Sequence, residues 1–183
     1  MISILTRTAC DRALCRLAEG ESEALTVIYE QLGRRIYLLA LSILQDTHAA
    51  EDVMQDTLLR LAQGGARSYA PGTNSVAFIL TVTRNLALTA LNRRERECPG
   101  DTIPEDATPC FTAPDSEPMQ ALPVLEGLDS EERQIVLLRL EYGMKHRDIA
   151  ALLGITTAAC EKKYSRAAAK MRAWYRGKHV TKT

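Results

Sequence analysis

Residues 50–61 read A-E-D-V-M-Q-D-T-L-L-R-L, a pattern that predicts an amphipathic helix over residues 48–62. Asp46 or Thr47 is suited to cap the beginning of this helix, and a glycine pair follows its end. The apolar stripe that would face a core contains Ala50, Val53, Met54, Thr57, Leu58 and Leu61. The other face carries Asp52, Gln55, Asp56 and Leu59 at spacings of three and four. This stretch therefore indicates a helical fold with an acidic outer face.

Two further amphipathic helices flank this segment. Before it, from Ser22, apolar residues recur at steps of three and four: Leu25, Ile28, Leu32, Ile36, Leu39 and Ile43. After it, a loop over residues 66–75 carries one aromatic residue and leads into a helix from Ser75 to Glu97. The apolar side of that helix contains Val76, Ile79, Leu80, Leu86, Ala87 and Leu91. No strand pattern interrupts residues 22–97, so they predict a bundle of three or four helices.

The neutral total charge, from 23 Lys plus Arg and 23 Asp plus Glu, hides an uneven distribution. Residues 98–122 carry five acidic groups and no basic one, and five of the seven prolines lie between Cys98 and Pro118. Proline blocks helix formation and like charges repel, so residues 98–121 are predicted to be an extended acidic linker. The chain is therefore expected to be all-α, with two small helical domains joined by a flexible tether.

The second helical block, residues 122–177, has the pattern of a helix-turn-helix. Asp129 and Glu132 have the spacing of a capping box at the beginning of its first helix. A short second helix ends at Gly154, and its inward side carries Ile149, Ala150 and Leu153. A helix, a glycine turn and a longer basic helix are typical of proteins that bind duplex DNA.

The longer helix begins at Thr156 or Thr157 and is strongly basic. Its predicted buried stripe contains Cys160, Tyr164, Ala167 and Met171. The rest of its circumference projects Thr157, Lys162, Lys163, Arg166 and Lys170. From Cys160 onward eight basic residues stand against one acid, Glu161. Such a stripe is the electrostatic footprint of phosphate contact, although a solvated helix face or a plain helical hairpin would show the same charges.

In this order the motifs resemble bacterial sigma factors of the sigma-70 family, above all the short extracytoplasmic-function group. The resemblance to region two rests on A50-E-D-V-M-Q-D-T-L-L-R-L61 and F78-I-L-T-V-T-R-N-L-A-L-T-A-L-N-R-R-E-R-E97. The resemblance to region four runs from Leu128 through D148-I-A150 and L153-G-I155 to Arg172. Together they cover residues 22–97 and 122–176. The resemblance implies a subunit that directs RNA polymerase to promoters by recognising their −10 and −35 elements.

The resemblance assigns three sets of site residues. The surface for the clamp helices of RNA polymerase falls on Asp52, Gln55, Asp56 and Leu59. The surface for the opened −10 strand falls on Tyr69, Asn74, Arg84, Asn85, Asn92 and Arg93, with the loop from Tyr69 to Ser75 capturing an unstacked base. The surface for the −35 duplex falls on Thr157, Glu161, Lys162, Lys163, Arg166 and Lys170.

The residue types suit these roles. Cationic side chains hold the phosphates of a melted strand, and a pocket or stacking platform holds a splayed base. Acidic side chains on a rigid helix suit a basic partner surface, and Glu161 can accept a hydrogen bond from a cytosine amino group. Phe78, Thr83 and Thr89 depart from the family pattern in the strand-holding helix. These departures predict weaker promoter melting or a different base preference.

The partners implied are core RNA polymerase, through its clamp helices and flap, promoter DNA and an anti-sigma factor. The chain is expected to be cytoplasmic, and nucleoid-associated while bound to polymerase. No apolar run approaches the ~20 residues of a membrane helix, and the N-terminus lacks the pattern of a secretory signal. A sigma-like module that binds polymerase or an anti-sigma factor without opening DNA remains the alternative.

No enzymatic activity, cofactor or metal site is expected. The five cysteines are odd in number and form no C-x-x-C pair, and no cluster of nucleophile and base appears. Cys98 and Cys110 leave open a role in redox or metal sensing. Residues 1–21 receive no assignment, and residues 178–183 are expected to be a basic tail.

Overall fold

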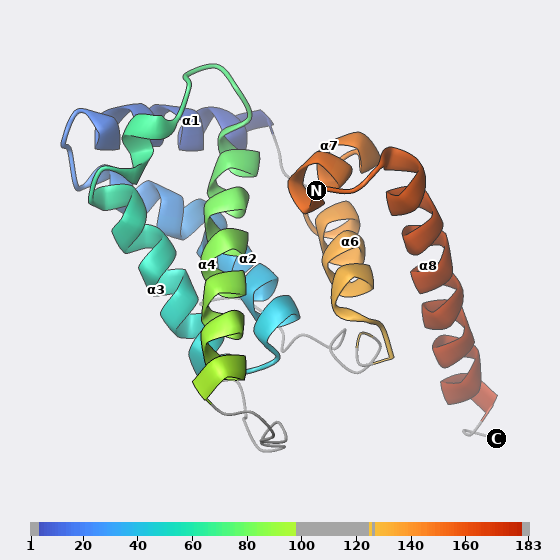
Figure 1. The fold of residues 1–183 in the computed structure, drawn as a ribbon. Coiled ribbons are helices and arrows are strands. Elements are labelled where there is room, and N and C mark those ends of the chain that lie inside the picture. The colour runs from blue at the N-terminus through green and yellow to red at the C-terminus, as the bar shows by residue number, and fades with distance from the viewer. Residues whose placement is uncertain (1–3, 98–124, 126, 181–183) are drawn as a thin grey trace. The chain divides into compact units, whose positions relative to one another are not determined.

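In the computed structural model, residues 4–97, 125 and 127–180 are described, and they form helices and turns with no strand (Figure 1). The chain divides into two compact units, Ile2–Cys110 and Phe111–Thr183. This division and the helical content confirm the predicted all-α class with two small domains. The predicted linker over residues 98–121, with Cys98 and Cys110, lies outside the described residues.

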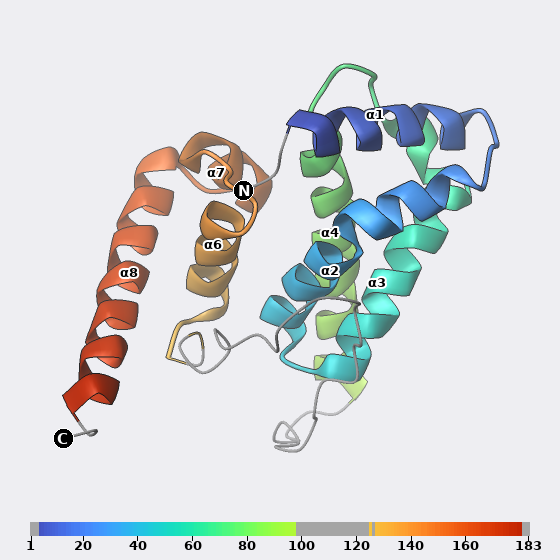
Figure 2. The ribbon, with the colours of Figure 1, turned by 180° about the vertical axis from the view of Figure 1, so that it is seen from behind.

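The first unit is a bundle built around one central helix. Its elements are α1 (Ile4–Ala18), α2 (Ala24–Leu44), α3 (Thr47–Ala62), the 3-10 turn η1 (Gly65–Ser68) and α4 (Ser75–Glu97). Helix α2 contacts α1, α3 and α4, and α3 also packs against α4. The two opposite views show α1 lying across one end of the bundle, beside the loop that leads into α4 (Figures 1 and 2).

The predicted apolar stripes form the core of this bundle. From α2, Ile28, Leu32, Ile36, Leu39 and Ile43 are buried, whereas Leu25 is partly exposed. Among the predicted residues of α3 and α4, those fully or nearly buried are Ala50, Val53, Met54, Thr57, Leu61, Val76, Ile79, Leu80 and Ala87. Leu58, Leu86 and Leu91 are partly buried. The helical period of the sequence therefore located the core faces, but it missed that residues 36–44 of α2 are buried on every side.

Polar side chains fix the ends and the interior of this bundle. Asp46 caps α3, because its carboxylate accepts a hydrogen bond from the backbone N–H of Ala49 at 3.0 Å. The second carboxylate oxygen of Asp46 lies 3.1 Å from the guanidinium of Arg94 near the end of α4. The hydroxyl of Thr57 on α3 lies 3.4 Å from that of Thr83 on α4, and both threonines are buried. Of the two predicted caps, Asp46 is the one used.

Helix α1 was not predicted, although it completes the core. Its buried residues are Cys10, Ala13, Leu14 and Leu17. The segment begins with two exposed apolar residues, Ile4 and Leu5, and carries charged side chains between its apolar ones. That arrangement blurs the apolar stripe, so the helix becomes recognisable only once its contacts with α2 and α4 are seen.

Helix α4 also differs from the expectation that no segment could span a membrane. By length and composition alone, Ser75–Arg94 is apolar enough to do so. In the structure this helix packs against α1, α2 and α3, and Ile79, Leu80 and Ala87 are buried there. A helix of a helical bundle can meet the same criterion, and the contacts of α4 place it in the bundle, with 33% of the candidate span buried.

The second unit is a helix-turn-helix preceded by one further helix. Its elements are α6 (Ser130–Leu140), α7 (His146–Leu153) and α8 (Thr157–Val180), and each contacts the other two. Its core contains Leu125, Leu128, Val136 and Ala167, with Tyr164, Met171 and Trp174 packed against them. Helix α8 continues to Val180, past the domain end expected at residue 177.

Local hydrogen bonds confirm the predicted signals in this unit. Both halves of the capping box form: the N–H of Glu132 donates to Asp129 at 2.8 Å, and the N–H of Asp129 donates to Glu132 at 3.2 Å. Gly154 ends α7 with φ +71°, a conformation that L side chains rarely adopt. The hydroxyl of Thr156 then accepts from the N–H of Ala159 at 3.2 Å and caps α8.

Truncation of Leu14 tests whether α1 belongs to the core. Leu14 has no exposed surface, so we expect L14A to lower the free energy of unfolding by about 2–5 kcal/mol. The matched control is L5A on the same helix, where the side chain is 81% exposed and truncation should change stability little. Urea unfolding of the full chain followed by circular dichroism measures both. Equal stability of the two variants would contradict the docking of α1.

Candidate functional site

The exposed face of α3 brings together the residues expected to contact a protein partner. Asp52, Gln55, Asp56 and Leu59 are all exposed, and Leu59 keeps 51% of its surface despite being apolar. Because the opposite face of α3 is buried in the bundle, the direction of these four side chains is fixed by the core. The surface thus offers two carboxylates and one apolar side chain on a rigid helix.

An open groove of about 570 Å³ runs beside this face, between α3 and α4. Asp52, Gln55 and Asp56 line one side of it, and Thr89 and Arg93 line the other. The groove therefore joins residues that the resemblance assigns to polymerase with one that it assigns to the −10 strand. The sequence treated these sets as separate surfaces, whereas the structure makes them neighbours.

Helix α4 presents a row of amide and cationic side chains. Asn85, Asn92 and Arg93 are exposed, and Arg84 is half-buried. Asn85, Thr89 and Asn92 recur at steps of four and three, so they share one side of the helix. Thr89 is exposed in this row, whereas Thr83 is buried beside Thr57. Of these two departures from the family pattern, Thr89 alone lies on the exposed surface.

The loop between η1 and α4 places its aromatic residue differently from the expectation. Tyr69 is 7% exposed, and its ring packs on that of Phe78 with centroids 5.3 Å apart. Its hydroxyl donates to the carboxylate of Asp11 on α1 and lies 3.1 Å from the carbonyl oxygen of Thr73. Tyr69 therefore stabilises the loop from within the bundle, and its ring has no exposed face on which a base could stack.

Asn74 also acts within the loop. Its side-chain oxygen accepts a hydrogen bond from the N–H of Ala77 at 3.1 Å, which caps the beginning of α4. The exposed part of the loop is residues 70–73, A-P-G-T. Asp11 is the residue of this site that the sequence did not predict. It lies in the unassigned segment 1–21, and no sequence motif there indicates a contact with the loop.

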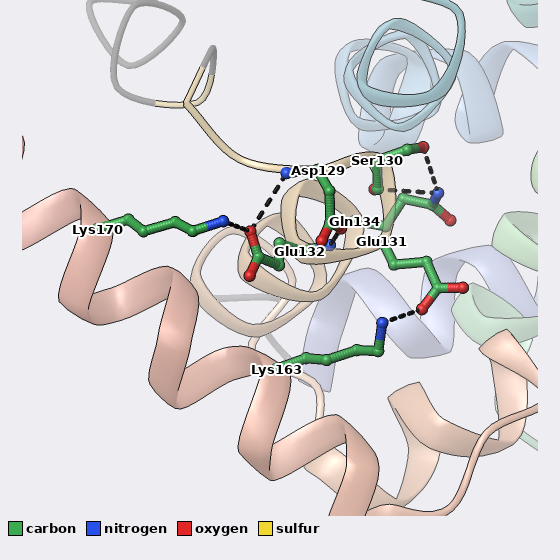
Figure 3. Close-up of polar contacts among 7 residues, drawn as sticks. All are labelled: Asp129, Ser130, Glu131, Glu132, Gln134, Lys163 and Lys170. Atoms are coloured by element: carbon green, nitrogen blue, oxygen red, sulfur yellow. Dashed lines mark hydrogen bonds and ion pairs between the residues drawn. The ribbon is translucent and has the colours of Figure 1, made fainter.

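The residues of the basic helix α8 that were predicted to face DNA fall into two groups, those without an ion pair to α6 and those paired with it. Thr157, Glu161, Lys162 and Arg166 are exposed. The ammonium group of Lys163 instead lies 2.7 Å from Glu131, and that of Lys170 lies 2.6 Å from Glu132, both on α6 (Figure 3). Both lysines therefore pair with α6, although the side chain of Lys170 remains 49% exposed and that of Lys163 33% exposed.

Burial and charge explain why these two lysines pair with α6. The side chain of Glu132 is only 4% exposed, and its carboxylate accepts from both Lys170 and the backbone N–H of Asp129 (Figure 3). A buried carboxylate requires such partners. The hydrogen bond to Glu131 raises the pKa of Lys163, so it favours the charged form of this lysine. The two ion pairs hold α8 against α6.

Comparisons with known proteins agree with this geometry. The model of sigma-70 region 2 matches residues 28–97, and that of sigma-70 region 4 matches residues 120–171. RNA polymerase sigma factor CarQ of Myxococcus xanthus is 30% identical over 86% of this chain and 92% of its own length. "Probable RNA polymerase sigma factor RfaY" of Xanthomonas campestris pv. campestris is 30% identical over 85% of this chain, which spans 41% of that protein.

A solved structure shows the same fold. The sigma factor RpoE from Bartonella quintana, in complex with the anti-sigma factor NepR, superposes with a TM-score of 0.69 and 24% identity. The match covers 81% of this chain and 94% of that one. The chain belongs to the sigma-70 family of RNA polymerase sigma factors and, within it, to the extracytoplasmic-function group.

Replacement of Lys170 tests the ion pair that joins α8 to α6. We expect K170A to lower the free energy of unfolding by about 1–2 kcal/mol, because it leaves the buried carboxylate of Glu132 without its cation. The matched control is K162A on the same helix, whose exposed side chain should contribute little to stability. Urea unfolding of the full chain distinguishes them. Equal stability of K170A and the unchanged protein would contradict the role of the ion pair.

Proposed function

We propose that this sigma factor binds core RNA polymerase through α3, holds the opened −10 strand along α4 and reads the −35 duplex with α8. The observation that carries the proposal is the outward face of the first bundle. There the acidic face of α3 and Arg93, from the arginine and asparagine row of α4, line one groove. A rigid surface of this kind can contact a protein and a DNA strand at the same time.

The polymerase contact is assigned to Asp52, Gln55, Asp56 and Leu59. Carboxylates at the edge of an interface steer a basic partner and raise the association rate. An exposed leucine beside them supplies apolar area that a partner can bury. The face therefore suits a surface with cationic side chains around an apolar depression, and the clamp helices of polymerase are the proposed partner.

The strand contact is assigned to Arg84, Asn85, Asn92 and Arg93, together with the loop that ends at Asn74. Arginines meet phosphates, and asparagines can meet base edges or sugars of an unpaired strand. The burial of Tyr69 and Asn74's bond to Ala77 give both a structural part in this proposal. The exposed backbone of residues 70–73 is then the part of the loop that meets the base.

The duplex contact is assigned to Thr157, Glu161, Lys162 and Arg166. These exposed residues lie in the first turns of α8, which follow the turn of the helix-turn-helix and are the part of such a helix that reaches base edges. Glu161 can accept from a cytosine amino group, and the two cations can meet phosphates. Lys163 and Lys170 take the indirect role of keeping α8 in position on α6.

An anti-sigma factor is a further proposed partner. The Bartonella relative was solved with one, and a reversible protein cover over the polymerase-binding face would control when the chain acts. We place the protein in the cytoplasm, with nucleoid association while it is bound to polymerase. Its contribution to transcription initiation is binding and orientation, and no covalent step is assigned to its residues.

Charge reversal on α3 tests the polymerase contact. We expect D52K/D56K to lose co-purification with core RNA polymerase, because both carboxylates would become cations facing a basic surface. Their exposure means that the fold should survive. E19K, an exposed acid outside this face, is the control and should retain binding. Unchanged polymerase binding by the double variant would exclude α3 as the contact.

The salt dependence of DNA binding tests which lysines and arginines of α8 contact DNA phosphates. Each phosphate contact that is lost should lower the slope of log affinity against log salt by about 0.9. We expect that drop for K162A and R166A in the full chain, measured by fluorescence anisotropy on a duplex carrying the −35 element. K163A should change the slope less, because Lys163 is held by Glu131. A full drop for K163A with none for K162A would reverse the assignment.

A further inference from the structure

Helix α1 is joined to the loop of the proposed −10 contact by hydrogen bonds from two of its turns. The carboxylate of Asp11 accepts from the Tyr69 hydroxyl and, at 3.1 Å, from the backbone N–H of Gly72. One turn earlier, the carbonyl oxygen of Arg7 accepts from the Ser75 hydroxyl at 2.9 Å. Positions 7 and 11 lie on the same side of the helix, so one edge of α1 holds the beginning, the tip and the end of the loop.

We propose that Asp11 is a positioning residue for promoter opening, which holds the loop over residues 69–74 in the shape that receives the unstacked −10 base. The inference rests on the proposed function of this loop. It assigns α1 a part in DNA melting in addition to its part in the core.

The geometry of the loop explains why a carboxylate is needed there. Gly72 has φ +80°, a conformation that L side chains rarely adopt, and its N–H points toward Asp11. Within the loop, the N–H and hydroxyl of Thr73 donate to the carbonyl of Ala70 at 3.2 and 2.6 Å, and the carbonyl of Thr73 lies 3.1 Å from the Tyr69 hydroxyl. The hydrogen bond from Gly72 to Asp11 joins the tip of the loop to α1, and loss of the Asp11 carboxylate would remove it. A loop that is already ordered lowers the conformational-entropy cost of capturing a base.

The ionised form of Asp11 is favoured in this position. The hydrogen bond from Tyr69 lowers the pKa of the carboxyl group, and the bond from the Gly72 N–H lowers it further. A charged acceptor makes a stronger hydrogen bond than a neutral one, so both contacts gain from it.

A role in positioning can be separated from a role in packing, because different side chains of α1 serve them. Cys10, Ala13, Leu14 and Leu17 face the core, whereas Asp11 is half-buried at the edge that meets the loop. A variant at Cys10 weakens packing and leaves the Asp11 carboxylate in place. The pair D11A and C10A therefore forms a matched comparison.

The experiment is in vitro transcription with the full-length variants and core RNA polymerase. Each variant is assayed on a closed promoter and on the same promoter with a non-complementary, pre-melted −10 segment. We expect D11A to reduce transcription from the closed promoter about tenfold, since it removes two hydrogen bonds to a charged group. The reduction on the pre-melted template should be much smaller, because unstacking is already supplied. Affinity for core polymerase should not change.

Two further variants make the result specific. D11N keeps an oxygen that can accept both hydrogen bonds and should retain more opening than D11A. Y69F removes only the hydroxyl that meets Asp11 and should show a smaller loss of the same kind. C10A should keep the unchanged protein's ratio of closed to pre-melted transcription, even where urea unfolding shows it to be as destabilised as D11A.

The outcomes distinguish this inference from the proposed function. Equal closed-promoter activity of D11A and the unchanged protein would overturn the positioning role, as would an equal shift in the ratio for C10A. Loss of opening in N74A with full opening in D11A would also overturn it while leaving the loop's function intact. Failure of the unchanged protein to transcribe from any closed promoter would instead overturn the proposed function itself.

Discussion

The burial of α2 against α1, α3 and α4 is the constraint on which the first unit depends. Ile28, Ile36 and Leu39 reach the centre of the bundle with no exposed surface, and full burial of such a side chain contributes about 1.5–3 kcal/mol. Each surrounding helix must turn its apolar side toward α2, so its polar side must face outward. The acidic face of α3 and the asparagine and arginine row of α4 are therefore set by the core, and rotation of either helix would break both packing and site.

The second unit depends on electrostatics more than its sequence suggests. Glu131 and Glu132 engage Lys163 and Lys170, so part of the positive charge of α8 is used within the unit. These contacts and the buried Cys160 and Ala167 set the rotation of α8 about its axis, so that Thr157, Glu161 and Lys162 face outward. The total charge of the basic segment is consequently larger than the positive charge available to contact DNA. The charges of Lys163 and Lys170 are paired within the unit, which leaves Thr157, Glu161, Lys162 and Arg166 as the proposed contact surface.

The sequence predicts what periodic patterns and local capping encode. The helices at α2, α3 and α4, the Asp46 cap, the capping box at Asp129 and the exposed face of α3 all follow from spacings within a few turns. The parts that the sequence did not predict depend on distant partners. Tyr69 meets Asp11 across 58 residues, and Lys170 meets Glu132 across 38. Helix α1 lacks a clear apolar stripe, so its place becomes apparent only from its contacts in the bundle.

The central claim is that this chain recruits polymerase and also opens promoter DNA. Potassium permanganate footprinting tests it most directly, because the reagent modifies thymines that have left the stack. Core polymerase and the protein would be incubated together and separately with a promoter library. The account predicts reactive thymines just upstream of a start site only when both components are present. Stable binding to polymerase without reactive thymines on any promoter would contradict it and indicate a sigma-like module that does not melt DNA.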